Sequence, residues 1–199
     1  MVRAIIFDAD GVLVKSERFS DRIARDHGAS TAEVGRFFKS EFAECKLGRR
    51  DLKRELEKRG AAWGWRGSAE GLMRYWFAEE ANPFDKHLLA RISELRSKGI
   101  RCFLATNNEK YRTENLWSDR GLGKELDGMF SSAHMGVMKP DPDFFGEIAD
   151  HLPGTAKEEI LFVDGDKACV EAAENFGFRA YHYRDFEAFE RELEELLKL

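Results

Sequence analysis

Short runs of hydrophobic residues alternate with longer amphipathic stretches along most of the 199-residue chain. An almost unbroken apolar run is typical of a strand that is covered on both faces, as in a parallel sheet. Helical patterns between such strands favour a doubly wound α/β arrangement. We therefore predict strands at residues 2–7, 100–105, 160–163 and 178–183, and a weaker strand at residues 128–133.

Amphipathic periodicity predicts the helices that connect these strands. Residues 86–97 place Leu88, Ile92 and Leu95 on one helical face, and Gly99 follows where the pattern stops. Glycine at that position is a common helix terminator. Similar patterns predict helices at residues 109–119, 144–152, 168–176 and 186–197.

Residues 16–81 interrupt the alternation of strands and helices. The segment holds almost no strand pattern, but helical patterns cover residues 17–27, 31–45, 50–59 and 68–80. We predict a small helical cap domain at residues 16–81, inserted into a core of residues 1–15 and 82–199. Most of its aromatic residues are expected to form its own hydrophobic core: Phe37, Phe38, Phe42, Trp63, Trp65, Trp76 and Phe77.

Composition and charge exclude several classes of protein. The formal net charge is −5 and the pI is near 5.7, so the chain lacks the basic character of a nucleic-acid binder. No apolar run reaches the length of a signal-peptide core or a membrane span. The three cysteines are odd in number and lack metal-ligand spacing, which favours reduced thiols. We expect a cytoplasmic protein that is a monomer or a small homo-oligomer and binds no membrane.

Two acid pairs follow predicted strands. Asp8 and Asp10 follow the first strand, and strand alternation places them on the same side. Asp164 and Asp166 follow the strand at 160–163. Ligands of parallel sheets bind at this carboxyl edge, and carboxylates close together require a cation or a proton between them. The alternative readings are an ordinary strand-to-turn exit for the first pair and a helix cap for Asp166.

Phosphate-binding groups are predicted at the same edge. Thr106 and Asn107 follow the second strand and can donate hydrogen bonds to phosphate oxygens, although helix capping also favours these residue types. Lys139 precedes Pro140, and a lysine held by a rigid turn can place its ammonium against a phosphate.

In this order, the acid pair, Thr-Asn, the lysine and the second acid pair resemble the haloacid dehalogenase superfamily, specifically members with a helical cap after the first strand. The resemblance covers residues 2 to about 183 and implies a Rossmann-like three-layer α/β core with a parallel sheet plus a small helical cap domain. It also implies a phosphatase that needs Mg²⁺ and acts on a small phosphorylated metabolite.

The resemblance assigns a role to each matching residue. Asp8 is the nucleophile that forms an aspartyl-phosphate, and Asp10 is the general acid and base. Thr106, Asn107 and Lys139 hold the transferring phosphate. The expected Mg²⁺ ligands are Asp8, Asp10 through its backbone carbonyl, Asp164 and Asp166.

Asp10 decides between branches of the superfamily. Its dehalogenases lack an acid at this position, because a halide leaves without a proton whereas an alkoxide needs one. The fourth motif departs from the usual pattern: Gly165 stands where a second acid is common, and Cys169 stands where Asp or Asn is common. We expect this to weaken Mg²⁺ binding, with Asp166 as a partial replacement.

The position of the cap favours a small phosphomonoester such as a sugar phosphate as the substrate. One alternative is a phosphomutase with the same core residues. Another is a phosphometabolite-binding regulatory protein in which Gly165 and Cys169 have weakened catalysis. A response-regulator receiver is disfavoured by the long helical insertion and by the Asp-X-Asp-Gly motif at Asp8.

Overall fold

The central sheet has five parallel strands in the order β3-β2-β1-β4-β5, as described for residues 1–198 by a computed structural model. In the middle of the sheet, Ile6 of β1 lies opposite Phe103 of β2 and Phe162 of β4. All residues of β1 and β4 are buried, so their unbroken apolar runs reflect helices on both faces. The predicted parallel α/β sheet is confirmed. The strands are β1 Ala4–Phe7, β2 Arg101–Thr106, β3 Gly128–Ser131, β4 Ile160–Asp164 and β5 Arg179–His182.

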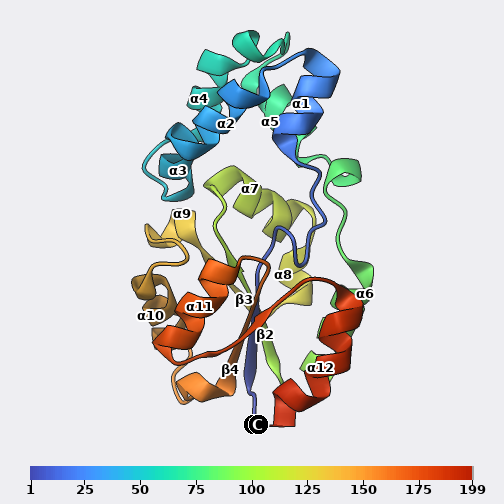
Figure 1. Ribbon diagram of the computed structural model, residues 1–199, viewed down its shortest axis with the longest axis vertical. Helices are drawn as coiled ribbons and strands as arrows, with labels where there is room; N and C mark the ends of the chain where they lie inside the picture. The colour runs from blue at the N-terminus through green and yellow to red at the C-terminus, as the bar shows by residue number, and fades with distance from the viewer. Residues whose placement is uncertain (199) are drawn as a thin grey trace.

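Helices cover the two faces of the sheet and form a three-layer core (Figure 1). Successive residues of β1 point to opposite faces. Ile5 and Phe7 pack in one cluster with Leu88 of α6 and Phe189 of α12, while Ile6 packs in the other with residues of α10 and α11. The core helices are α6 Lys86–Ser97, α7 Lys110–Glu114, α8 Leu122–Glu125, α9 Ser132–Met135, α10 Pro142–Asp150, α11 Lys167–Phe176 and α12 Phe186–Lys198.

Five further α-helices lie between β1 and α6 and occupy the upper part of Figure 1. We call residues 19–77 the helical insertion. Its apolar side chains form a separate cluster that includes Phe37, Trp63 and Leu72. Ser30, Asp51 and Ser68 begin three of the helices by accepting hydrogen bonds from backbone amides. The helices are α1 Phe19–His27, α2 Thr31–Lys39, α3 Glu41–Lys46, α4 Leu52–Arg59 and α5 Ala69–Phe77.

Several helices are shorter than their sequence patterns predict. The helix predicted at 31–45 is divided at Ser40, where φ is −116° and ψ is −94°. The Ser40 hydroxyl donates to the Arg36 carbonyl at 2.7 Å and so competes with continuation of the helix. The helix predicted at 109–119 is divided into α7 and a π-helix that follows it directly, Asn115–Asp119. Short 3₁₀ helices are found at Ala61–Trp63, Glu79–Ala81 and Lys157–Glu159.

The insertion contacts α7 and α9 of the core, and the two segments that connect it to the core bond to each other. Where the chain leaves and re-enters the core, Lys15 N–H donates to the Pro83 carbonyl at 2.9 Å. On the opposite side, a Cβ at Gly48 would lie 2.5 Å from the Ala133 carbonyl oxygen, and φ there is +70°. Both the close approach and the left-handed backbone require glycine at this position. The division into a core and a cap at residues 16–81 stays a prediction.

No helix within residues 1–198 is long and apolar enough to cross a membrane. The three cysteines, Cys45, Cys102 and Cys169, are free and buried.

Candidate active site

Lys139 joins the ends of two strands at the carboxyl edge of the sheet. Its Nζ donates to Asp8 Oδ1 at 2.7 Å, to Asp164 Oδ2 at 2.7 Å and to the Ala105 carbonyl at 2.9 Å. These bonds use all three ammonium protons. The Lys139 side chain is only 2% exposed, and burial opposes its charge, but the carboxylates of Asp8 and Asp164 raise its pKa above the usual range. Lys139 is therefore a fixed cation.

Asn107 holds the backbone of Lys139. The Asn107 Nδ2 donates to the Lys139 carbonyl at 2.8 Å, and the Lys139 N–H donates to Asn107 Oδ1 at 2.9 Å. This reciprocal pair fixes the loop that carries the ammonium group. A direct contact between Asn107 and phosphate stays a prediction.

Asp8 follows β1, and its N–H donates to the Val163 carbonyl of β4 at 2.9 Å. Its side chain is 15% exposed. The pKa of Asp8 is raised to about 7, mainly by burial; Lys139 opposes the shift and the charge of Asp164 adds to it. Two carboxylates thus share one ammonium, and an added cation would favour the ionised form of both.

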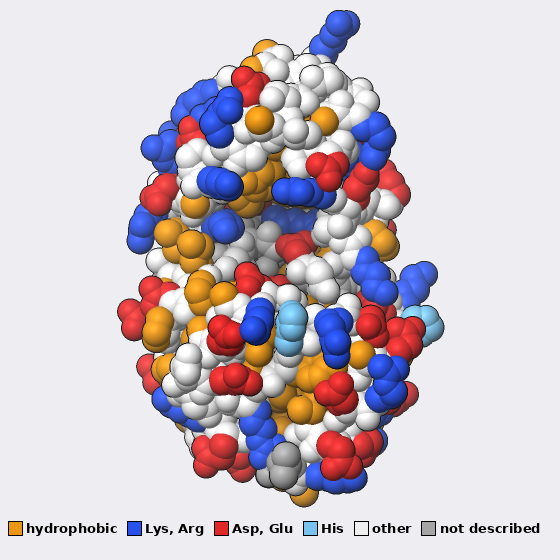
Figure 2. Space-filling view, viewed as in Figure 1, with side chains coloured by type: hydrophobic (Ala, Val, Ile, Leu, Met, Phe, Trp, Pro, Cys, Tyr) orange, Lys and Arg blue, Asp and Glu red, His pale blue; other side chains and the backbone are white. Residues whose placement is uncertain are grey.

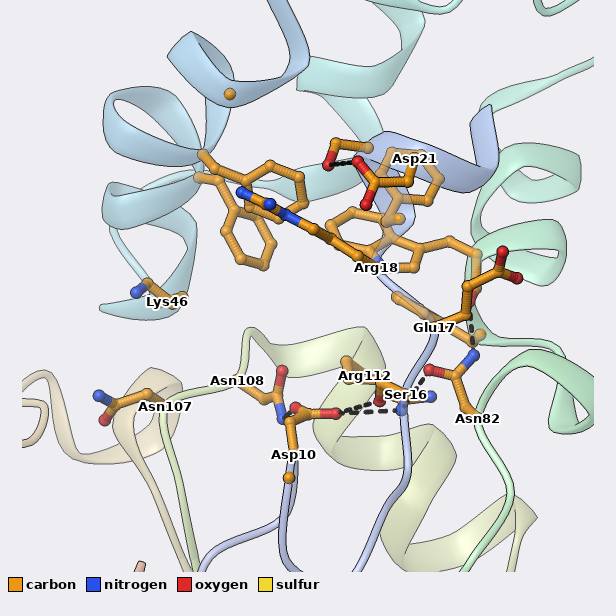
Figure 3. Close-up of a pocket in the computed structure, with 18 of the residues that line it drawn as sticks. Asp10, Ser16, Glu17, Arg18, Asp21, Lys46, Asn82, Asn107, Asn108 and Arg112 are labelled. Carbon is orange, nitrogen blue, oxygen red and sulfur yellow. Dashed lines mark hydrogen bonds and ion pairs between the residues drawn. The ribbon is translucent and has the colours of Figure 1, made fainter. Parts of the chain in front are cut away.

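Asp10 has other partners and is 42% exposed. The chain turns after it at Gly11, where φ is +92°. Asp10 Oδ1 accepts a hydrogen bond from the Ser16 hydroxyl at 2.8 Å and lies 3.4 Å from Arg112 Nη2. Asp10 Oδ2 accepts from Asn108 Nδ2 at 2.7 Å. The Asp10 carboxylate consequently faces the space beneath the helical insertion (Figure 3).

Arg112 and Asn108 are site residues to which the sequence assigned no role. Arg112 is 4% exposed and also donates from Nη2 to Asn82 Oδ1 at 3.1 Å. Asn108 also donates to Thr106 Oγ1 at 2.8 Å, so it connects Thr106 with Asp10. Asn108 adjoins the Thr106-Asn107 strand end, and no pattern in the sequence marks Arg112.

The two residues of the second acid pair, Asp164 and Asp166, have different partners. Asp164 is 1% exposed, and its Oδ1 accepts from the Asp166 N–H at 2.8 Å. Asp166 is exposed and begins α11, with its Oδ1 accepting from the Ala168 N–H at 2.9 Å. This is the capping alternative for Asp166, and its role as a metal ligand stays a prediction.

Gly165 and Cys169, the two residues that depart from the usual fourth motif, differ in what surrounds them. A Cβ at Gly165 would have its nearest neighbour, the Tyr183 carbonyl oxygen, at 3.9 Å, so a larger side chain has room there. Burial raises the pKa of Cys169 to about 12, and the charge of Asp164 contributes in the same direction. Cys169 is therefore a neutral thiol and a poor metal ligand.

The residues at this edge suit Mg²⁺ rather than a metal held by side chains alone. Within residues 1–198, no three acidic, histidine or cysteine side chains gather closely enough to bind an ion. Asp8 and Asp164 do converge, because both bind Lys139. Mg²⁺ is commonly held by one or two carboxylates together with water and substrate phosphate, so this oxygen donor set fits it.

Two adjoining cavities reach the site. A cavity of about 710 Å³ is lined by Asp8, Thr106, Lys139 and Asp164, and a second of about 860 Å³ lies beneath the helical insertion. Both are lined by three of the same residues: Asp10, Gly11 and Asn107. Figure 2 shows the molecule hollowed across its middle, with Lys or Arg and hydrophobic side chains along the upper rim.

Sequence comparison places these features among hydrolases. Residues 2–177 match the family model of haloacid dehalogenase-like hydrolases. The chain is 28% identical to a sesquiterpene phosphatase of Aspergillus oryzae over 199 residues, covering 98% of this chain and 96% of the relative. It is also 28% identical to a phosphatase of Mycobacterium tuberculosis over 195 residues, covering 90% and 86% of the two chains.

Structural comparison agrees on the fold. An enzyme of the HAD (haloacid dehalogenase) family from Bacteroides thetaiotaomicron, solved in complex with magnesium and inorganic phosphate, superposes with a TM-score of 0.76 and 16% identity. The superposition covers 91% of this chain and 93% of the other.

Proposed function

This chain belongs to the haloacid dehalogenase-like hydrolases, and on that premise we propose that it is a Mg²⁺-dependent phosphatase that hydrolyses a small phosphomonoester through an aspartyl-phosphate at Asp8. The observation that carries the proposal is the ammonium of Lys139, held between Asp8 and Asp164 in the lining of a cavity. A buried, fixed cation beside a carboxylate is suited to a reaction in which that carboxylate meets a phosphate anion.

The reaction has two displacements. An Asp8 oxygen forms a bond to phosphorus, the bond from phosphorus to the alcohol oxygen breaks, and protonated Asp10 gives its proton to that oxygen. Water then attacks phosphorus, Asp10 takes the water proton, and the bond to Asp8 breaks to release phosphate. General acid–base catalysis of this kind contributes about 100- to 10,000-fold. Ser16, Asn108 and Arg112 hold the Asp10 carboxylate for both steps.

Charge at the phosphate is offset by the chain's own groups. Lys139 provides a fixed positive charge, and Thr106, 1% exposed at the end of β2, provides a hydroxyl donor. Asn107 keeps Lys139 in place. Mg²⁺, held by Asp8, Asp164 and the backbone carbonyl of Asp10, with Asp166 acting through water, would supply the charge that lets two anions approach.

We assign residues 16–81 the role of a cap over this edge. The second cavity lies between the helical insertion and Asp10, so a bound substrate would be enclosed from above. Enclosure excludes water while the phosphoenzyme forms. Both curated relatives are phosphatases, which favours hydrolysis over the phosphomutase alternative.

The test is phosphate release from sugar phosphates and aryl phosphates, with and without Mg²⁺. We expect Mg²⁺-dependent release that is abolished in Asp8→Asn and falls about 100- to 10,000-fold in Asp10→Asn. Acid quenching of the wild-type enzyme during turnover should trap phosphate on Asp8. Full activity of folded Asp8→Asn, or no release from any phosphomonoester, would contradict the proposal.

A further inference from the structure

The cavity beneath the helical insertion has an aromatic wall on one side. We define the aromatic wall as five lining residues of the insertion: Phe19, Phe38, Phe42, Trp76 and Phe77. The rings touch one another, with centroids 4.3 Å apart for Phe19 and Trp76 and 5.3 Å apart for Phe38 and Trp76. Phe38 and Trp76 are only partly buried, so they still expose apolar surface to the cavity. Figure 3 shows several rings grouped above the floor that carries Asp10 and Asn108.

The amide and hydroxyl groups on the cavity floor are already bonded to the protein. Ser16 donates to Asp10, and the Asn82 amide donates to the Trp76 and Ala78 carbonyls at 2.8 Å and 2.9 Å. Asn108 uses its amide protons on Asp10 and Thr106. A sugar needs both donors and acceptors for its hydroxyls, and few of these amide and hydroxyl groups remain available for that purpose. The charged side chains of Arg18, Asp21 and Lys46 also line the cavity.

The cavity is also the place into which the leaving group must extend. Asp10 lines both cavities, and it is the residue proposed to protonate the leaving oxygen. With phosphorus bound beside Asp8 and Lys139, the carbon atoms attached to that oxygen continue past Asp10 towards the aromatic wall. A volume of about 860 Å³ is in the range of pockets that enclose a whole organic ligand.

From these observations we infer that the substrate is a phosphomonoester of a hydrophobic alcohol or phenol, whose apolar body packs against the aromatic wall. This inference rests on the proposed phosphatase function and specifies its substrate class. Apolar surface that leaves water on the aromatic wall stabilises the bound ester in proportion to its area.

A homologous series of n-alkyl phosphates from ethyl to octyl tests the substrate class, with glucose 6-phosphate as the polar comparison. We expect kcat/KM to rise with chain length, by up to about fourfold per methylene, and to exceed the value for glucose 6-phosphate. A flat series, or a preference for the sugar phosphate, would overturn the inference while leaving the phosphatase function intact.

Gly35 allows the cavity to be filled without removing any side chain. It lies in α2 and lines the cavity, and a Cβ there meets nothing within 4 Å. Gly35→Leu should favour the helix and abolish the gain in kcat/KM with chain length. The matched control is Gly146→Leu, since Gly146 lies in α10 with nothing within 4 Å and outside this cavity. An unchanged series in Gly35→Leu would contradict the inference.

Calorimetric titration with n-alkylphosphonates, which cannot be hydrolysed at the phosphorus–carbon bond, separates the inference from the function it rests on. We expect the Kd to fall with chain length and the heat capacity change on binding to become more negative. That pattern without any phosphate release would contradict the proposed phosphatase but support the hydrophobic site. Phosphate release together with a Kd independent of chain length would overturn the inference alone.

Discussion

Of the four lysines that line the two adjoining cavities, Lys139 and Lys46 have opposite surroundings. At the sheet edge, Lys139 is 2% exposed and binds two carboxylates and a carbonyl. Beneath the helical insertion, Lys46 is partly buried, and no carboxylate within residues 1–198 forms an ion pair with it. The two carboxylates raise the pKa of Lys139, whereas burial lowers the pKa of Lys46 and the charge of Lys139 adds to that effect.

This difference separates the two parts of the proposed site. Groups at the sheet edge are fixed by one another before substrate arrives, which is the condition under which electrostatic stabilisation of a reacting phosphate is strongest. The insertion supplies apolar surface and charges whose partners would come with the substrate. We infer that the sheet edge determines the reaction and that the helical insertion determines which phosphate ester reacts.

Lys139→Met should have the largest effect of any single change. It leaves Asp8 and Asp164 buried together without their shared cation, and loss of one partner of a buried ion pair costs about 3–5 kcal/mol. Phosphate release should fall by at least about 1,000-fold. Urea unfolding and phosphate assays measure the two effects, with Lys98→Met as the control because Lys98 is exposed. Wild-type stability in Lys139→Met would show that the ion pairs of Lys139 with Asp8 and Asp164 do not form in solution.

The second prediction concerns α7, which carries Arg112 to Asp10 and lies between the two regions. Its first residue is preceded by Glu109, 1% exposed, whose carboxylate accepts from the Tyr111 and Arg112 amides. Burial is the main cause that raises the pKa of Glu109 from 4.5 to about 7. The folded state therefore binds the proton more tightly than the unfolded state. Stability should fall as pH rises from about 4.5 to about 7, by up to about 3 kcal/mol.

Glu109→Gln keeps an acceptor for the two amides and removes the titration. The free energy of unfolding of this variant, measured in urea at pH 5 and pH 8, should therefore fall less than that of the wild type. The fall that remains comes from Asp8, whose pKa is also raised to about 7. Glu114→Gln is the matched control, because Glu114 lies exposed on the same helix. Equal pH dependence in wild type and Glu109→Gln would exclude the buried carboxyl as its cause.

The sequence was sufficient for the sheet because β1 and β4 are unbroken apolar runs that end in aspartates. Parallel strands bring their carboxyl ends together, so placing Asp8 near Asp164 required only the strand boundaries. The role of Asp166 as a cap could not be separated from metal binding, since both need an aspartate before a helix.

Features that depend on tertiary contacts could not be predicted. The pairing of Arg112 with Asp10 joins residues 102 positions apart, and no motif marks it. Adjacent Phe37 and Phe38 look alike in the sequence, yet Phe37 is fully buried in the insertion and Phe38 lines the cavity. Which aromatic side chain faces a ligand depends on how α2 packs against its neighbours, and the sequence pattern predicts only that α2 is helical.

Gly165→Asp should add an anion to the sheet edge that holds Asp8, Lys139 and Asp164. The position has room for a side chain, and its φ lies outside the left-handed region. A third carboxylate near Asp8 and Asp164 should tighten Mg²⁺ binding by up to about tenfold, as affinity rises with ligand charge. Calorimetric titration of Mg²⁺ measures this, and Gly165→Asn supplies similar volume without charge. Equal affinity in both variants would mean that the added carboxylate does not reach the ion.

Lys46→Met should have the smallest effect on stability, and the opposite sign to Lys139→Met. Because folding lowers the pKa of Lys46, its positive charge is less favourable in the folded state, and removing it should stabilise the protein by less than about 1 kcal/mol. The KM for phosphate esters should rise, because this ammonium lines the cavity and its charge attracts the phosphate of an entering ester, and Lys46→Arg should restore it. A loss of stability in Lys46→Met would reveal an anionic partner within the protein. Lys46 would then have a partner within the protein, as Lys139 does. The two lysines would no longer support assigning the reaction to the sheet edge and substrate selection to the helical insertion.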